Sequence, residues 1–309
     1  MTKKRIKLSG RDVQLFVMVG CSLVFLAAFA YAPMFGIVLA FKDADRSLNI
    51  LEAMSDSPWC GLDNFKAFLL DNSFVDVLIN TIGLNLLMLL INFPMPILFA
   101  LMLNEVRSVR FKRAIQTITN FPHFISWAIF GGIILSLTDM TTGVITPGVE
   151  ALGLSDPQNP VNLNLAQYFW AEMIIASLIK SVGWGSIIYM AAIAGISQEL
   201  YEAADIDGAG RAAKMFRITL PMLMPTVTVF LLLQISKLLG NSYEQFIIFQ
   251  NDLNIEKSEV LITYSYKMGL GNRRYSYATA MTLFESVISV LLLVGSNFIS
   301  KKLTGRGIY

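Results

Sequence analysis

The feature that most constrains the fold of this 309-residue chain is a set of six long apolar runs. The hydrocarbon layer of a bilayer is ~30 Å thick, so a helix that crosses it needs about 20 mostly apolar residues. Runs of this length extend over 13–41, 74–103, 114–137, 168–196, 222–249 and 277–299. In lipid, helices satisfy all their backbone hydrogen bonds internally. The sequence therefore predicts an all-α membrane protein with six transmembrane helices.

The low charge content supports this class. Charged residues make up 15% of the chain, against about 25% in average globular proteins. This composition excludes a disordered or collagen-like chain and argues against a cytosolic enzyme. The net charge of +2 gives no support for a nucleic-acid partner. Cys21 and Cys60 have no metal-like spacing, so the sequence predicts neither a metal site nor a disulfide, and it leaves the redox state of Cys60 open.

The distribution of basic residues predicts the orientation of the chain. Lysine and arginine are frequent before the first run and after the second, fourth and sixth runs, and they are sparser in the alternate loops. Because cytoplasmic loops carry the excess of basic residues, both termini are predicted to face the cytoplasm. The N-terminal run resembles a secretory signal that ends near Ala30, but it continues past Pro33 to Phe41 and is interpreted as a retained span. In the external loop, Phe65 and Phe68 predict a short amphipathic helix.

The cytoplasmic loop after the fourth run has strong helix start and stop signals. Ser197 is predicted to cap a helix that Gly208 and Gly210 end, and a second short helix is predicted from Arg211 to Pro221, where the fifth run opens. Two short helices at a glycine hinge fit a groove on a soluble partner. The alternative is a helix pair that lies on the lipid surface.

The same loop carries a family resemblance. Glu202-Ala203-Ala204-Asp205-Ile206-Asp207-Gly208-Ala209, followed by Phe216 and Leu220-Pro221, resembles the EAA loop of ABC importer permeases. Gly61-Leu62, Asn64-Phe65 and Asn80-Thr81 resemble the entry to the second span in carbohydrate-uptake permeases. Nearly the whole chain is similar to the permease subunits of oligosaccharide and polysaccharide importers.

This resemblance implies a division of the chain and a set of partners. Residues 1–12 and 300–309 would be cytoplasmic tails, 13–73 the first transmembrane helix and the external loop, and 74–299 the ABC importer permease (MetI-like) core with the coupling loop 197–220. The implied partners are a cytoplasmic ABC ATPase dimer, a second homologous permease subunit, an extracellular solute-binding protein, a carbohydrate and the lipid of a bacterial cytoplasmic membrane.

The resemblance also implies that the chemistry of ATP lies on another subunit. ATP and Mg would bind the partner ATPase, while this chain would bind no cofactor or metal and supply no catalytic residue. The sequence has no G-x-x-x-x-G-K-[ST] phosphate loop, in agreement with this expectation. The residues that the resemblance assigns to ATPase coupling are Glu202, Ala203, Ala204, Asp207, Gly208 and Phe216.

Polar residues inside the apolar runs predict a substrate pathway, because such residues usually face a bundle interior or a cavity. In the fifth run they recur at i, i+3, i+7 and i+10, which is one face of a single helix. Others stand in the third and fourth runs. The alternative is that they hold neighbouring helices together. The candidate pathway residues are Asn120, Trp127, Lys180, Trp184, Gln234, Lys237, Asn241 and Glu244.

These residue types suit a sugar, since hydroxyl groups need donors and acceptors, and a pyranose face stacks on Trp127 or Trp184. Lys180 and Lys237 suggest a cargo with carboxylates, such as a uronic-acid oligosaccharide; the alternative is that they pair with Glu172, Glu244 or Glu285. His123, after Pro122, is interpreted as a residue of a proline bend with a satisfied imidazole. Three other functions stay open: an ABC permease for a non-sugar solute, an ion-driven carrier or channel, and a membrane enzyme, for which no reactive constellation is evident. The identity of the sugar, and whether the second permease is an identical copy, also stay open.

Overall fold

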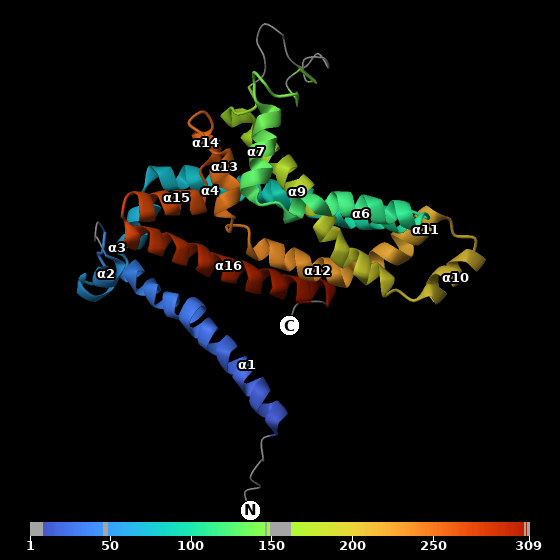
Figure 1. The fold of residues 1–309 in the computed structure, drawn as a ribbon, viewed down its shortest axis with the longest axis horizontal. Coiled ribbons are helices and arrows are strands. Elements are labelled where there is room, and N and C mark those ends of the chain that lie inside the picture. The colour runs from blue at the N-terminus through green and yellow to red at the C-terminus, as the bar shows by residue number, and fades with distance from the viewer. Residues whose placement is uncertain (1–8, 46–48, 146, 149–161, 306, 308–309) are drawn as a thin grey trace, which may run out of the picture. The chain divides into compact units, whose positions relative to one another are not determined.

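A computed structural model describes residues 9–45, 49–145, 147–148, 162–305 and 307 (Figure 1). Throughout these ranges the regular structure is helical, and the one β-type pairing is an isolated bridge between Lys42 and Trp59. Of the predicted tails 1–12 and 300–309, residues 1–8, 306 and 308–309 lie outside the described residues. The chain forms two compact units, residues 1–68 with 268–283 and residues 69–267 with 284–309.

Helices that are long and apolar enough to cross a membrane account for the predicted runs. Five are continuous, and a sixth is a pair of helices bent by 103°. The all-α membrane class is therefore confirmed. The five continuous candidates are Gly10–Phe41, Asn72–Asn104, Ala166–Ala194, Arg211–Ser236 and Tyr275–Lys302, and the bent pair is Val109–Phe124 with Trp127–Thr138.

The first unit contains the N-terminal helix and the external loop. Helix α1 (Gly10–Leu26) continues through a π turn (Ala27–Tyr31) into a 3-10 helix (Ala32–Phe41), and the loop holds α2 (Ile50–Asp56) and the start of α3 (Asp63–Leu69). Helix α3 confirms the short helix predicted there. The Asn64 side chain ties it to the end of the 3-10 helix, because Nδ2 donates to the carbonyl oxygens of Ala40 at 3.0 Å and Lys42 at 2.9 Å.

In the second unit, α9 (Ala166–Ala194) is the central helix, since it packs against α4, α5, α6, α12 and α14. Small residues on α9 permit neighbouring helices to approach it closely. A Cβ at Gly183 would lie 2.3 Å from the Thr119 carbonyl oxygen and 2.7 Å from Asn120 Oδ1. The other helices described in this unit are α4 (Asn72–Asn92), α5 (Pro94–Asn104), α6 (Val109–Phe124), α7 (Trp127–Thr138), α10 (Gln198–Ile206), α11 (Arg211–Lys214), α12 (Leu220–Ser236), α13 (Tyr243–Phe249), α14 (Ile255–Ser258), α15 (Leu261–Tyr266) and the last part of α16 (Tyr275–Thr304).

The third predicted span is not one straight helix. Helix α6 ends at Phe124 and α7 begins at Trp127, nearly at a right angle to it (Figure 1). Pro122 in the last turn of α6 cannot donate a backbone hydrogen bond. Ser126 then starts the new helix, because its hydroxyl accepts from the backbone N–H of Ile129 at 3.4 Å.

The fifth predicted span, 222–249, is wrong as a single helix. Helix α12 ends at Ser236, residues 237–242 are not helical, and α13 starts at Tyr243. The predicted stripe of Gln234, Lys237, Asn241 and Glu244 therefore does not lie on one helix. The break is stabilised from outside, since Asn85 of α4 donates to the Leu238 carbonyl oxygen at 2.7 Å.

The second short helix predicted from Arg211 is also wrong as a separate element. Helix α11 runs through a π turn (Met215–Thr219) directly into α12. The wider turn precedes Pro221, whose ring has no N–H to continue the regular ladder. The backbone N–H of Leu220 bonds instead to the Met215 carbonyl oxygen. The membrane helix therefore begins at Arg211 and is longer than the apolar run.

Candidate functional site

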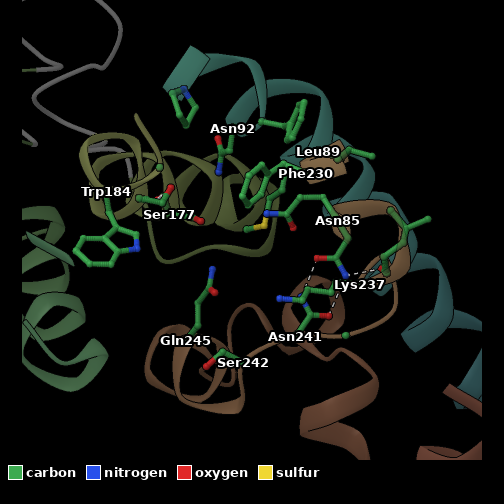
Figure 2. Close-up of a pocket in the computed structure, with 18 of the residues that line it drawn as sticks. Asn85, Leu89, Asn92, Ser177, Trp184, Phe230, Lys237, Asn241, Ser242 and Gln245 are labelled. Carbon is green, nitrogen blue, oxygen red and sulfur yellow. Dashed lines mark hydrogen bonds between the residues drawn. The ribbon is translucent and has the colours of Figure 1, made fainter. Parts of the chain in front are cut away.

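A cavity of about 430 Å³ lies in the second unit, where α4, α5, α9, α12 and the 237–245 segment meet (Figure 2). Its polar lining consists mostly of side-chain amides and hydroxyls, and its apolar lining is rich in aromatic rings. The polar residues are Asn85, Asn92, Ser177, Ser181, Gln234, Lys237, Asn241, Ser242 and Gln245, and the aromatic residues are Phe93, His123, Trp184, Tyr189 and Phe230.

Two asparagines from distant parts of the chain form one wall of the cavity. Asn85 Nδ2 donates to Asn241 Oδ1 at 2.9 Å, and Asn241 Nδ2 donates to Asn85 Oδ1 at 2.7 Å (Figure 2). This reciprocal pair holds the non-helical segment between α12 and α13 against α4. The break in the fifth span therefore brings backbone and side-chain amides into the cavity.

Lys237 is the one side chain with a full formal charge among the described lining residues, and none of them is an aspartate or a glutamate. Its side chain is exposed, and across the described chain its ammonium has no hydrogen bond or ion pair. An uncompensated cation among amides and hydroxyls favours a polar ligand that is neutral or anionic.

Trp184 forms an aromatic surface at the cavity. Its ring is stacked on His123, with centroids 4.5 Å apart and planes 4° apart, and Phe124 meets it edge-on at 5.6 Å. Trp184 nevertheless keeps 45% of its surface exposed. The imidazole of His123 is thus held by ring stacking, and it lines the cavity rather than lying wholly within a proline bend.

Lys180 lies outside the cavity lining and has a different environment from Lys237. Only 8% of it is exposed, and Nζ donates to the carbonyl oxygens of Pro122 at 3.0 Å, His123 at 3.5 Å and Ile125. These carbonyls belong to the break between α6 and α7. The hydrogen-bond partners of Lys180 are therefore backbone carbonyls. From the sequence, the expected partner was either a carboxylate of the cargo or a glutamate of the chain.

Of the eight candidate pathway residues, the cavity brings together Trp184, Gln234, Lys237 and Asn241. The other four do not line it. Trp127 packs against an apolar cluster, Asn120 lies against Gly183 with its Oδ1 buried and unpartnered among the described residues, and Glu244 is exposed on α13. Asn85 and Asn92 of the second run also line the cavity, although from the sequence single asparagines in a span were interpreted as contacts between helices and were not chosen as pathway residues.

The coupling loop has the predicted start and turn. The Ser197 hydroxyl accepts from the Glu199 backbone N–H at 3.3 Å to begin α10, and Gly208 has φ +74°, a conformation that favours glycine. Five of the six predicted coupling residues are exposed, and Ala204 is half-buried; the exposed ones are Glu202, Ala203, Asp207, Gly208 and Phe216. Ile206, which the sequence argument did not single out, is 88% exposed.

Contacts across this loop join its two arms. The Tyr201 hydroxyl lies 2.9 Å from the Thr219 hydroxyl, and Lys214 forms an ion pair with Asp205. Both contacts link α10 to the segment that leads into α12. A displacement of α10 would therefore be passed to the base of a membrane helix through side chains as well as through the backbone.

Comparison with known proteins places this architecture in a family. Residues 73–305 match the model of the binding-protein-dependent transport system inner membrane component. The chain is 39% identical to Protein LplB of Bacillus subtilis, over 97% of this chain and 92% of that protein. It is 37% identical to the polygalacturonan/rhamnogalacturonan transport system permease protein YteP of the same organism, over 96% of this chain and 89% of that protein.

Two solved structures share the fold. One is a crystal structure of a bacterial ABC transporter involved in the import of the acidic polysaccharide alginate, with a TM-score of 0.84, 35% identity, and coverage of 95% of this chain and 97% of that chain. The other is a bacterial alginate ABC transporter in complex with alginate pentasaccharide-bound periplasmic protein, with a TM-score of 0.84, 34% identity, and coverage of 96% and 97%.

Proposed function

Because the chain belongs to the family of binding-protein-dependent transport system inner membrane components, we propose that it is the permease subunit of an ABC importer that carries oligosaccharides across the bacterial cytoplasmic membrane. It is a multi-pass membrane protein, and the basic residues of its alternate loops support cytoplasmic termini. The observation that carries the proposal is the cavity of amides, hydroxyls and one exposed tryptophan.

The chemistry of the cavity suits a sugar. The amides of Asn92, Gln234 and Gln245 supply both donors and acceptors, which the hydroxyl groups of a saccharide require. Trp184 supplies a flat apolar surface for one face of a pyranose ring.

The cargo that we propose is acidic, with Lys237 as its counter-charge. Lys237 projects into a lining that has no carboxylate, so its charge is available to a ligand. Two of the related proteins are named for acidic polymers, polygalacturonan and alginate, which agrees with a uronic-acid oligosaccharide. Lys180 has no such role in this proposal, because its ammonium is already bound to backbone carbonyls.

The proposed coupling to ATP runs through α10. Glu202, Ala203 and Ile206 present an acidic and apolar surface at the end of the unit that holds α10 and α11 (Figure 1). This surface suits a groove on a cytoplasmic ATPase dimer, which would hold ATP and Mg. A second homologous permease and an extracellular solute-binding protein complete the proposed importer, while this chain supplies no catalytic residue.

The cargo is tested by comparing an oligogalacturonide with its methyl ester, which replaces each charged carboxylate by a neutral ester that is one methyl group larger. Both are delivered by the cognate binding protein to the complete importer in proteoliposomes. We expect Lys237→Met to reduce oligogalacturonide uptake about tenfold, as the loss of a hydrogen bond to a charged group predicts, and to leave ester uptake unchanged.

Lys237→Arg is the matched control, since it keeps the charge and is expected to keep most of the uptake. An equal loss of both sugars in Lys237→Met would contradict recognition of the carboxylate. Uptake of the oligogalacturonide by the wild type that did not depend on ATP would contradict the importer assignment itself.

A further inference from the structure

The break between α6 and α7 leaves backbone carbonyls that no helix satisfies. The last four carbonyls of a helix have no intrahelical donor, and Pro122 in this turn has no N–H to offer. The side chain of Lys180, from the middle of α9, donates to the carbonyl oxygens of Pro122 at 3.0 Å, of His123 at 3.5 Å and of Ile125. The Pro122 oxygen also accepts from the Ile125 backbone N–H at 3.3 Å. Three carbonyls around one ammonium fix the direction in which the chain leaves α6.

The surroundings of Lys180 compensate the charge of its buried ammonium. A buried cation is costly unless it is paired or fully hydrogen-bonded. Lys180 has no ion pair in the described part of the chain. Its charge is balanced by the carbonyl end of α6, and by the rings of Trp127 at 5.1 Å and Phe130 at 5.4 Å from Nζ. Those rings belong to α7, so one ammonium contacts both sides of the break.

The same stripe of α9 reaches the cavity wall. Lys180, Gly183 and Trp184 follow one another at i, i+3 and i+4 and therefore share a helix face. Gly183 permits close contact with the backbone of α6, and Trp184 stacks on the ring of His123, whose carbonyl oxygen Lys180 binds. His123 is thus held by its backbone and by its ring from a single face of α9.

We propose that Lys180 is a positioning residue: it locks the break between α6 and α7, and so holds the stacked His123–Trp184 pair at the cavity wall. The inference rests on the proposed function only in treating the cavity as the path of the cargo. It differs from the interpretation in which the ammonium of Lys180 touches a carboxylate of the sugar. The two are separated by a measurement of geometry and a measurement of selectivity.

The geometry is measured by thiol crosslinking in the full chain with Cys21 and Cys60 replaced by serine. One cysteine pair replaces His123 and Trp184 at the break. A second pair replaces Gln116 and Met190, whose side chains meet at 3.0 Å further along α6 and α9. A short bifunctional thiol reagent is applied to membranes that contain the assembled complex. Each pair is combined with Lys180, with Lys180→Met and with Lys180→Gln, which keeps one donor group.

We expect Lys180→Met to lower crosslinking of the 123–184 pair about tenfold, as the loss of at least one charge-assisted hydrogen bond predicts. The 116–190 pair should be unchanged, because it lies away from the break. Lys180→Gln should give an intermediate value for the 123–184 pair. Unchanged crosslinking at 123–184 would overturn the proposal, and so would loss of the 116–190 crosslink in both variants, because Lys180 would then act on the whole bundle.

The selectivity is measured as uptake of the oligogalacturonide and of its methyl ester by the importer with Lys180→Met. This variant is used because it is expected to retain the 116–190 crosslink. A positioning role predicts equal loss of uptake for both sugars, in contrast to Lys237→Met. Loss confined to the charged sugar would overturn the proposal in favour of direct contact with the cargo. The crosslinking result does not depend on which cargo is carried, so its failure is distinguishable from failure of the proposed function.

Discussion

Lys180 and Lys237 are both lysines inside apolar runs, and they have opposite environments. Lys180 is buried and bound to three backbone carbonyls, whereas Lys237 is exposed in a cavity without a carboxylate. Each lies in the middle of an apolar run, and from the sequence alone both fit either an acidic cargo or a pair with a glutamate. The difference comes from partners that are distant in the chain, which a pattern of single residues does not contain. In this account only Lys237 is available to bind the cargo.

Gly183 gives a prediction at the scale of one residue. Replacing glycine by alanine inside a helix normally stabilises by about 0.5–1 kcal/mol. Here the new Cβ would lie 2.3 Å from a backbone oxygen of α6, which cannot rotate away as a side chain does. Overpacking costs about 1–3 kcal/mol, so the steric cost wins and Gly183→Ala is expected to lower the melting temperature of the detergent-purified complex.

Gly132→Ala is the matched control, because Gly132 is also helical and a Cβ there would meet nothing within 4 Å. It should leave the melting temperature unchanged or raise it slightly. If Gly183→Ala proved as stable as Gly132→Ala, the close approach of α6 and α9 would be wrong.

At the scale of elements, apolar length predicted the spans well and their breaks poorly. Each run contains helix, because ~20 apolar residues in lipid have few other ways to satisfy their backbone. The interruptions near Pro122 and Gly240 were not predicted, because a short turn hardly changes the average hydropathy of the long run that contains it. The non-helical segment is stabilised by Asn85 on another helix, which is tertiary information.

The candidate site was likewise predicted only in part. Trp184, Gln234, Lys237 and Asn241 were predicted and do line the cavity, although the continuous helix used to argue for three of them does not exist. The rule that polar residues in a span face a cavity held for these residues but not for Asn120, Lys180 and Glu244, and the single-helix geometry derived from it was wrong. In the loop after the fourth span, Ser197 and Gly208 marked the ends of α10 correctly, because caps and left-handed glycines act locally.

Gly208 gives a prediction at the scale of the coupling element. A left-handed conformation costs an ordinary residue roughly 1–2 kcal/mol, and a β-branched side chain suffers most. Gly208→Val is therefore expected to displace α10 and to reduce the ATP-driven uptake of the reconstituted importer several-fold, with normal membrane insertion. Gly210→Ala is the control, because Gly210 has φ −71° and open space around it. Equal uptake in the two variants would mean that the turn at Gly208 does not position α10.

At the scale of the whole molecule, two features of the second unit are connected. One is a cavity bounded by breaks in two spans, and the other is an exposed loop whose arms are linked by Tyr201–Thr219 and Asp205–Lys214 contacts. A π turn and α12 connect that loop to the cavity segment, so a movement of α10 has a short path to Gln234 and Lys237. This connection is the structural basis for proposing that ATP hydrolysis on a partner drives sugar transport here.

The most direct test of this central claim is uptake of a labelled oligogalacturonide by proteoliposomes that contain the purified importer with this chain. The account predicts accumulation that requires both ATP and the cognate binding protein, and that persists when an uncoupler removes the ion gradients. Accumulation without ATP that collapses with the uncoupler would contradict the account and identify an ion-driven carrier instead.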